Sequence, residues 1–205
     1  VTDGESNNII FHDINDIYNG RKVQKEEFTG YEAALYEDNL LHTDAFSKAK
    51  DYYSSIFSGV DIDFLPPKDK DDGSPSSDDM RIISDVDVNI VTNYCNQHSI
   101  SFNAFMNAVF GFVLAEYNYR EDCVFATVYN GRNNSKLKDT VSMLVKTLPV
   151  YCKINNNDSV SDYVDMVQNQ LINSMSNDIF SFADISKEFG ITSDILFVNE
   201  GDMFN

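Results

Sequence analysis

The sequence predicts an α/β or α+β domain in which helices cover a mixed β-sheet. Amphipathic segments with helical spacing alternate along the chain with short apolar segments of strand length. The 205 residues, 42% hydrophobic and 13% aromatic, can bury a real core and make one large domain or two small ones. A layered domain needs both kinds of element, and the chain supplies them in alternation.

The first helix is expected after a short extended start. The apolar Val1 ahead of Asp3-Gly4 indicates the end of a strand followed by a turn. Ser6 can cap a helix whose isoleucines follow at helical spacing over residues 10–17, and Asn19-Gly20 ends it. An Asp-Gly turn that feeds a helix is either ordinary turn chemistry or the tail of a functional motif that lies mostly upstream.

Two further helices are expected before residue 60. Residues 28–37 form a short aromatic helical stretch, and Thr43 can cap a second helix that Gly59 ends. Together they indicate a helical hairpin. Residues 66–79, PPKDKDDGSPSSDD, hold three of the four prolines and no large apolar side chain, so we expect a flexible acidic loop there.

The middle of the chain predicts the core. A short strand over 80–83 and a helix around 90–95 lead to Ser101, which can cap the most apolar helix of the chain. Large apolar residues cover most of the circumference of that helix, so we expect it to be central. Residues 123–129, CVFATVY, predict a buried strand.

The last third predicts strands and helices in alternation. Residues 144–154 form a strand that Pro149 places at a sheet edge. Ser159 and Ser181 are each followed three residues later by Asp, which is typical of a capping box at the start of a helix. A last strand is expected over 194–198.

Charge and cysteine content bear on partners and compartment. The formal charge of -18 argues against nucleic acid or an anionic membrane surface as a partner, because phosphates would be repelled. Cys95, Cys123 and Cys152 lie too far apart for a zinc motif or a disulfide framework, and they fit buried thiols in a reducing compartment. No apolar stretch long enough for a membrane anchor and no signal peptide is visible.

A search for catalytic motifs by residue type finds none. The chain has no Gly-rich phosphate loop, no paired Cys-x-x-Cys and no Gly-x-Ser-x-Gly. His12, His42 and His98 stand far apart in the sequence, and each is interpreted as a surface or capping residue. No metal and no directly bound cofactor are expected.

The order of several motifs, rather than any one of them, resembles a known family. VTDGES is similar to the second half of the His-His-x-x-x-Asp-Gly-x-Ser signature of nonribosomal peptide synthetase condensation domains. FTGYEAALYE, AFSKAKDYYSSIFSG with its following LPP, ISFNAFMNAVFGFVLAEYNYREDCVFATVYNGR, VSMLVKTLPVYCKI and NDIFSFADI resemble later family segments in the same order. The resemblance implies a chloramphenicol acetyltransferase-like lobe.

The resemblance also bears on domain organisation. The strand that carries both histidines would stand just before Val1, so residues 1–205 are expected to be a single partial domain, the C-terminal lobe of a two-lobed condensation domain. Without the histidine pair, this part is expected to be inactive by itself.

The activity implied is an acyltransferase reaction that forms an amide bond between a carrier-bound aminoacyl or peptidyl donor and an aminoacyl acceptor. The substrates would arrive on phosphopantetheine arms. The expected partners are peptidyl carrier proteins, the N-terminal lobe and an adenylation domain, and the resemblance implies a cytoplasmic peptide synthetase. A related acyltransferase with a free acceptor, or a non-catalytic recruiting module of the same fold, remains open.

The resemblance assigns roles to individual residues. Asp3 and Gly4 are what remains of the catalytic motif, and Arg132, at the end of a buried strand, is the expected structural partner of Asp3. Ser142, Lys146 and Thr147 are expected to line the substrate channel.

The chain departs from the family pattern at some of these positions. Lys146 stands where the family usually has Asn, Gly30 where Asp is common and Ser142 where Gly is common. The segment before the last strand is shortened to ITSD. These departures bear on substrate selectivity rather than on the fold.

Overall fold

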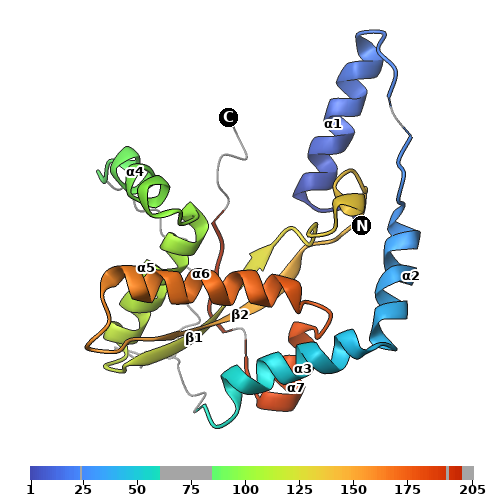
Figure 1. Ribbon diagram of the computed structural model, residues 1–205. Helices are drawn as coiled ribbons and strands as arrows, with labels where there is room; N and C mark the ends of the chain where they lie inside the picture. The colour runs from blue at the N-terminus through green and yellow to red at the C-terminus, as the bar shows by residue number, and fades with distance from the viewer. Residues whose placement is uncertain (24, 61–84, 193, 200–205) are drawn as a thin grey trace, which may run out of the picture.

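The computed structural model describes residues 1–23, 25–60, 85–192 and 194–199. These residues form α1 (Gly4–Tyr18), α2 (Gly30–Leu41), α3 (Asp44–Phe57), α4 (Val88–His98), α5 (Phe102–Tyr117), β1 (Asp122–Tyr129), a 3₁₀ helix (Ser135–Leu137), β2 (Lys146–Lys153), α6 (Val160–Ser176), α7 (Phe182–Phe189) and β3 (Leu196–Phe197). Helices pack on a β-sheet (Figure 1), as expected for the predicted α/β or α+β class. The loop expected over 66–79 and the strand expected over 80–83 lie outside the described residues.

The sheet is mixed, as predicted, with the strand order β2-β1-β3. β1 and β2 pair antiparallel along their whole length, from Asp122 opposite Lys153 to Tyr129 opposite Lys146, and β3 pairs parallel to β1. In the described part of the sheet β2 is an edge strand. Pro149 lies opposite Ala126, whose backbone N–H donates to the carbonyl of Ile195, the residue before β3. The missing N–H of the proline therefore interrupts no bond between β1 and β2.

The core lies between the sheet and the helices α5 and α6, which pack on β1 and β2 (Figure 1). α5 approaches the sheet through small residues, and a Cβ atom on Gly111 would overlap the sulfur of Cys152. α3 and α7 pack beside β2, where Phe57 contacts both Tyr151 and Phe189. Cys95, Cys123 and Cys152 are free and buried, which confirms their interpretation as buried thiols.

The prediction that α5 is central is confirmed, but the outer side of the helix stays exposed. Its contacts with the sheet, α4 and α6 bury Ala104, Ala108, Leu114 and Ala115. The large side chains of Val109, Phe112 and Val113 remain 41%, 45% and 57% exposed. The small residues face the sheet because they allow the helix backbone to come close, and the larger ones are left on the outer side.

The N-terminal segment differs from its prediction. Val1 is fully exposed and is not part of a strand. α1 begins at Gly4 because the carboxylate of Asp3, rather than the hydroxyl of Ser6, caps the helix by accepting from the N–H of Ser6. Ser6 is buried in the first turn instead. The caps predicted at Thr43, Ser101, Ser159 and Ser181 are confirmed.

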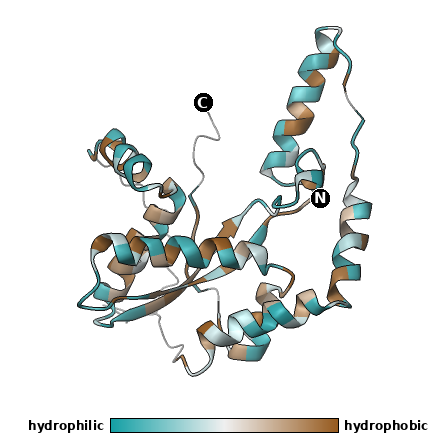
Figure 2. Ribbon diagram, in the orientation of Figure 1, coloured by the Kyte–Doolittle hydropathy of each residue, from teal (hydrophilic) through white to brown (hydrophobic). Residues whose placement is uncertain are grey.

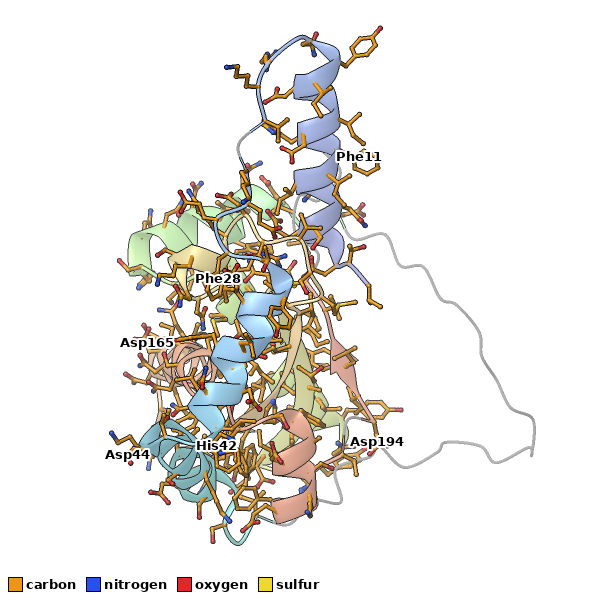
Figure 3. All side chains as sticks on the ribbon, turned by 90° about the vertical axis from the view of Figure 1, so that its right-hand side faces the viewer. Phe11, Phe28, His42, Asp44, Asp165 and Asp194 are labelled. Atoms are coloured by element: carbon orange, nitrogen blue, oxygen red, sulfur yellow. The ribbon has the colours of Figure 1, made fainter. Side chains whose placement is uncertain are left out.

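α1 and α2 extend away from the rest of the structure (Figure 1). α2 meets α3 at a corner near His42, so the two helices do not form the expected hairpin (Figures 1 and 3). Apolar residues recur along α1 (Figure 2). Phe11, Ile14, Ile17 and Tyr18 are all more than half exposed, and Figure 3 shows Phe11 directed away from the rest of the chain.

No single helix in the described ranges is long and apolar enough to cross a membrane. α4 and α5 together meet the length and composition requirement, and they are bent by 109° at their junction.

Candidate functional site

The predicted pair between Asp3 and Arg132 is present. Asp3 caps α1, and Arg132 follows the end of β1 in the loop that begins at Asn130. The guanidinium donates from Nη1 to Oδ2 of Asp3 at 2.9 Å and from Nη2 to Oδ1 at 3.1 Å. The side chain of Asp3 is only 1% exposed, and that of Arg132 is only 4% exposed. A two-point charge-assisted contact between residues 129 positions apart ties the start of α1 to the end of β1.

The carboxylate of Asp3 is also bound by backbone groups. It accepts from the N–H of Ser6 at 2.8 Å and from the N–H of Leu144 at 3.0 Å. Leu144 lies just before β2, so Asp3 connects three segments: the start of α1, the loop after β1 and the approach to β2. The carbonyl of Thr140 accepts a further bond from Arg132 Nη2 at 3.1 Å. The pair is therefore the centre of a buried polar network.

Burial alone would raise the pKa of Asp3, because it penalises the charged form. The hydrogen bonds from Arg132, Leu144 and Ser6 outweigh burial and hold the pKa of Asp3 well below its usual value. Asp3 is thus an anion that stays paired throughout the neutral range, as a structural residue requires. It cannot take a proton from a substrate at neutral pH.

Ser6 belongs to the same polar network, although the sequence prediction assigned it only as a cap. Its hydroxyl lies 2.7 Å from Asp3 Oδ1 and 2.8 Å from the carbonyl oxygen of Ser142, and its single proton can serve one of these acceptors at a time. The hydroxyl accepts from the N–H of Ser142 at 3.0 Å. The serine three positions after Asp3 in VTDGES was the available signal for this role.

Gly131 permits the loop after β1 to reach this network. Its φ of +69° is in the left-handed region, and a Cβ atom there would overlap the carbonyl oxygen of Leu144. The tight backbone approach predicted for Gly131 is confirmed. Gly4, in contrast, is the exposed first residue of α1 and is not among the glycines with positive φ, so its backbone requires no glycine.

Two departures from the family pattern touch each other. A Cβ atom on Gly30 would lie 2.8 Å from Oγ and 2.9 Å from Cβ of Ser142. A larger side chain at position 30 therefore competes with the side chain at position 142. In this chain the smaller residue, Gly30, lies in α2 and the larger one, Ser142, lies in the segment before β2. The family commonly has the reverse arrangement, with Asp at the first position and Gly at the second.

Lys146 and Thr147 line a cavity of about 450 Å³ together with Glu37, Leu41, Asp178 and Phe182. Nζ of Lys146 forms ion pairs with Glu37 of α2 and, at 3.4 Å, with Asp178 of the loop between α6 and α7. Tyr129 donates its hydroxyl to the same Asp178 carboxylate. Ser142 is not part of this lining. The expected channel residues thus fall into two groups, one at Asp3 and one at this cavity.

None of the three histidines lies in either group. His12 is an exposed residue of α1 beside Asp16, His42 is the C-cap of α2 and His98 packs on Tyr94. Among the described residues, no three His, Cys, Asp or Glu side chains gather as a metal ion would need.

The solved structures show the fold. The first condensation domain of the calcium-dependent antibiotic synthetase superposes with a TM-score of 0.72 at 14% identity, over 97% of this chain and 46% of that one. The X-domain from teicoplanin biosynthesis, solved in complex with OxyB, superposes with a TM-score of 0.68 at 15% identity, over 93% of this chain and 45% of that one. The fold is that of a chloramphenicol acetyltransferase-like lobe.

The family follows from the sequence comparisons. The family model of the condensation domain matches residues 1–199, and the chain belongs to that family. Gramicidin S synthase 2 of Brevibacillus brevis is 21% identical over 204 residues, which are 95% of this chain and 4% of the synthetase. The chain therefore spans less than half of the solved condensation domain and a small part of the synthetase.

Proposed function

We propose that the chain is part of a nonribosomal peptide synthetase condensation domain that forms an amide bond between a carrier-bound donor and an aminoacyl acceptor. The observation that carries the proposal is the buried pair of Asp3 and Arg132, because it places the Asp-Gly motif of the family match in an ordered network. The similarity to Gramicidin S synthase 2 and to Tyrocidine synthase 2 of Brevibacillus parabrevis, which is 23% identical, supports the same reaction.

In this reaction the acceptor amine attacks the thioester carbonyl, a tetrahedral oxyanion forms, the amine loses a proton and the carrier thiol leaves. The family resemblance assigns the proton-handling role to a histidine of the motif that ends in Asp3-Gly4. Asp3 and Arg132 act as positioning residues, because their contacts with Leu144 and Thr140 hold the motif against the segment before β2. Residues 1–205 alone are proposed not to form peptide bonds, since no described histidine lies beside Asp3.

The proposed partners are carrier proteins that present substrates on phosphopantetheine, an adenylation domain and a preceding lobe of the same domain. The exposed apolar side of α1 supports the lobe as a partner, because Phe11, Ile14 and Ile17 offer apolar surface that a neighbouring segment would bury.

We propose a cytoplasmic location, and the three free thiols support a reducing compartment.

A second candidate function is recruitment without catalysis. The similarity to the X-domain solved with OxyB favours it, because that protein shows the same fold in a complex with another protein. A third candidate is acyl transfer to a free acceptor.

The test uses the complete parent polypeptide with donor and acceptor carriers that have been loaded enzymatically. Mass spectrometry of the acceptor carrier should show the extended peptidyl thioester. Product only with a free amine would replace the proposal with the free-acceptor enzyme, and no product in either assay would favour the recruiting module. Residues 1–205 assayed alone should show no turnover above background.

A further inference from the structure

The cavity beside Lys146 has the size and the lining of a ligand site. Its volume of about 450 Å³ falls in the range of small-molecule pockets, which is roughly 300–1,000 Å³. Residues of α2, β2, α7 and the loop before α7 surround it. Leu41, Ile179 and Phe182 supply apolar surface, and charged groups supply the polar part. Such a lining suits a short hydrocarbon chain that ends in a charged group.

The charges of the lining decide which sign that group carries. The carboxylates of Glu37 and Asp178 contact one ammonium, that of Lys146. Asp184 also belongs to the lining, where its carboxylate caps α7 by accepting from Ser181. An anionic ligand would be repelled, whereas a cation would reduce the imbalance. Lys146 itself shows that the site accommodates a primary ammonium, because its Nζ contacts both Glu37 and Asp178.

We propose that this cavity binds an alkylammonium group, with the carboxylates of Asp178 and Glu37 as its acceptors. The ligand ammonium would share these acceptors with Lys146, and its alkyl chain would lie along Leu41 and Phe182. This proposal rests on the cavity alone and does not require the amide-forming reaction.

The site should bind more tightly at higher pH. Asp178 is contacted by Tyr129 of β1 and Lys146 of β2, and it interacts electrostatically with Glu37 of α2 and Tyr53 of α3. Asp184 of α7 lines the same cavity. Burial, and then the charge of Glu37, raise the pKa of Asp178 to about 7. A cation binds the ionised form, so its affinity should rise between pH 6 and pH 8.

The test titrates the chain with hexylammonium, hexan-1-ol and hexanoate, with isothermal calorimetry at pH 6 and pH 8. Hexylammonium should bind more tightly than the other two, and more tightly at pH 8. Asp178→Asn and Glu37→Gln should each weaken its binding about tenfold, the effect of losing one charge-assisted hydrogen bond. Asp139→Asn, at an exposed residue that does not line this cavity, is the control and should leave affinity unchanged.

Lys146→Asn gives the sharpest outcome, because it removes the competing ammonium and installs the side chain that the family usually has. The variant should bind hexylammonium more tightly than the unmodified chain. Weaker binding by Lys146→Asn, equal binding of hexanoate, or unchanged affinity in both carboxylate variants would overturn the proposal. Unchanged far-ultraviolet circular dichroism shows that each variant is folded.

A further arm distinguishes a free amine from a carrier-bound one, and only this arm rests on the proposed function. The probe is S-(6-aminohexyl)pantetheine, a stable thioether that joins an alkylammonium chain to the carrier arm. Tighter binding than hexylammonium would assign the site to carrier-bound substrates. Equal or weaker binding would assign it to free amines and leave the cavity proposal intact.

Discussion

Gly30 and Ser142 are in direct contact across the interface between α2 and the segment before β2. A Cβ atom on Gly30 would come within 2.8 Å of the Ser142 hydroxyl oxygen, which is closer than unstrained packing allows. Each residue is a departure from the family pattern, and the close approach places the two departures side by side.

Gly30→Asp should therefore destabilise the chain by about 1–3 kcal/mol, the usual cost of overpacking. Ser142→Gly in the same chain should restore most of the loss, because it removes both atoms of the close contact. Urea unfolding of the two single variants and the double variant measures the coupling. Additive effects in this double-mutant cycle would show that the two positions do not compete for space.

Gly131→Ala should destabilise the chain more than Gly20→Ala. Both glycines have a φ near +70°, so alanine carries similar backbone strain at either position, about 1–2 kcal/mol. Only at Gly131 does the added Cβ overlap the carbonyl of Leu144, while Gly20 has no atom within 4 Å. Thermal unfolding of both variants measures the difference. Equal losses would mean that the loop after β1 does not press against Leu144 in solution.

Stability should depend on pH through Asp178. Its pKa is about 7 in the folded chain, whereas an ordinary aspartate, as in the unfolded chain, has a pKa of 3.8. Between these two pH values the folded state therefore binds more protons than the unfolded state. The free energy of unfolding therefore falls as pH rises through this window, by at most about 1.4 kcal/mol per pH unit for one group. Asp178→Asn should flatten the dependence between pH 5 and pH 7. A steeper fall in the variant would contradict the assignment.

The pH dependence of Asp3 has the opposite sign. Its pKa is lowered in the folded chain, so its contribution is present above its reference value of 3.8 and is lost as pH falls below that value. The two carboxylates therefore act in different pH windows.

Helix ends and strands were predictable from the sequence because they depend on short-range patterns. Ser101, Ser159 and Ser181 cap helices as their local context indicates, and Pro149 marks an edge strand in the described sheet. The cap of α1 was assigned wrongly because Asp3 and Ser6 both suit an N-cap. Only the long-range contacts with Arg132 and Leu144 show that the carboxylate takes the position.

The pair of Asp3 and Arg132 was predictable only through the family resemblance, since no local pattern links residues 129 positions apart. The role of Lys146 was incompletely predicted for the same reason. Its partners Glu37 and Asp178 come from α2 and from the loop before α7, and no pattern in the sequence relates these segments. Charge alone could not find them in a chain with 33 acidic residues.

The most direct test of the central claim measures peptide formation by the complete parent polypeptide with Arg132→Ala. We predict that kcat falls about a hundredfold, the cost of misplacing a reacting group by roughly 1 Å, while KM for the loaded carriers changes little. Arg21→Ala removes an exposed pair with Asp16 and is the control, with no expected change in kcat. Turnover by Arg132→Ala equal to that of the unmodified polypeptide would contradict the claim that Arg132 positions the motif through Asp3.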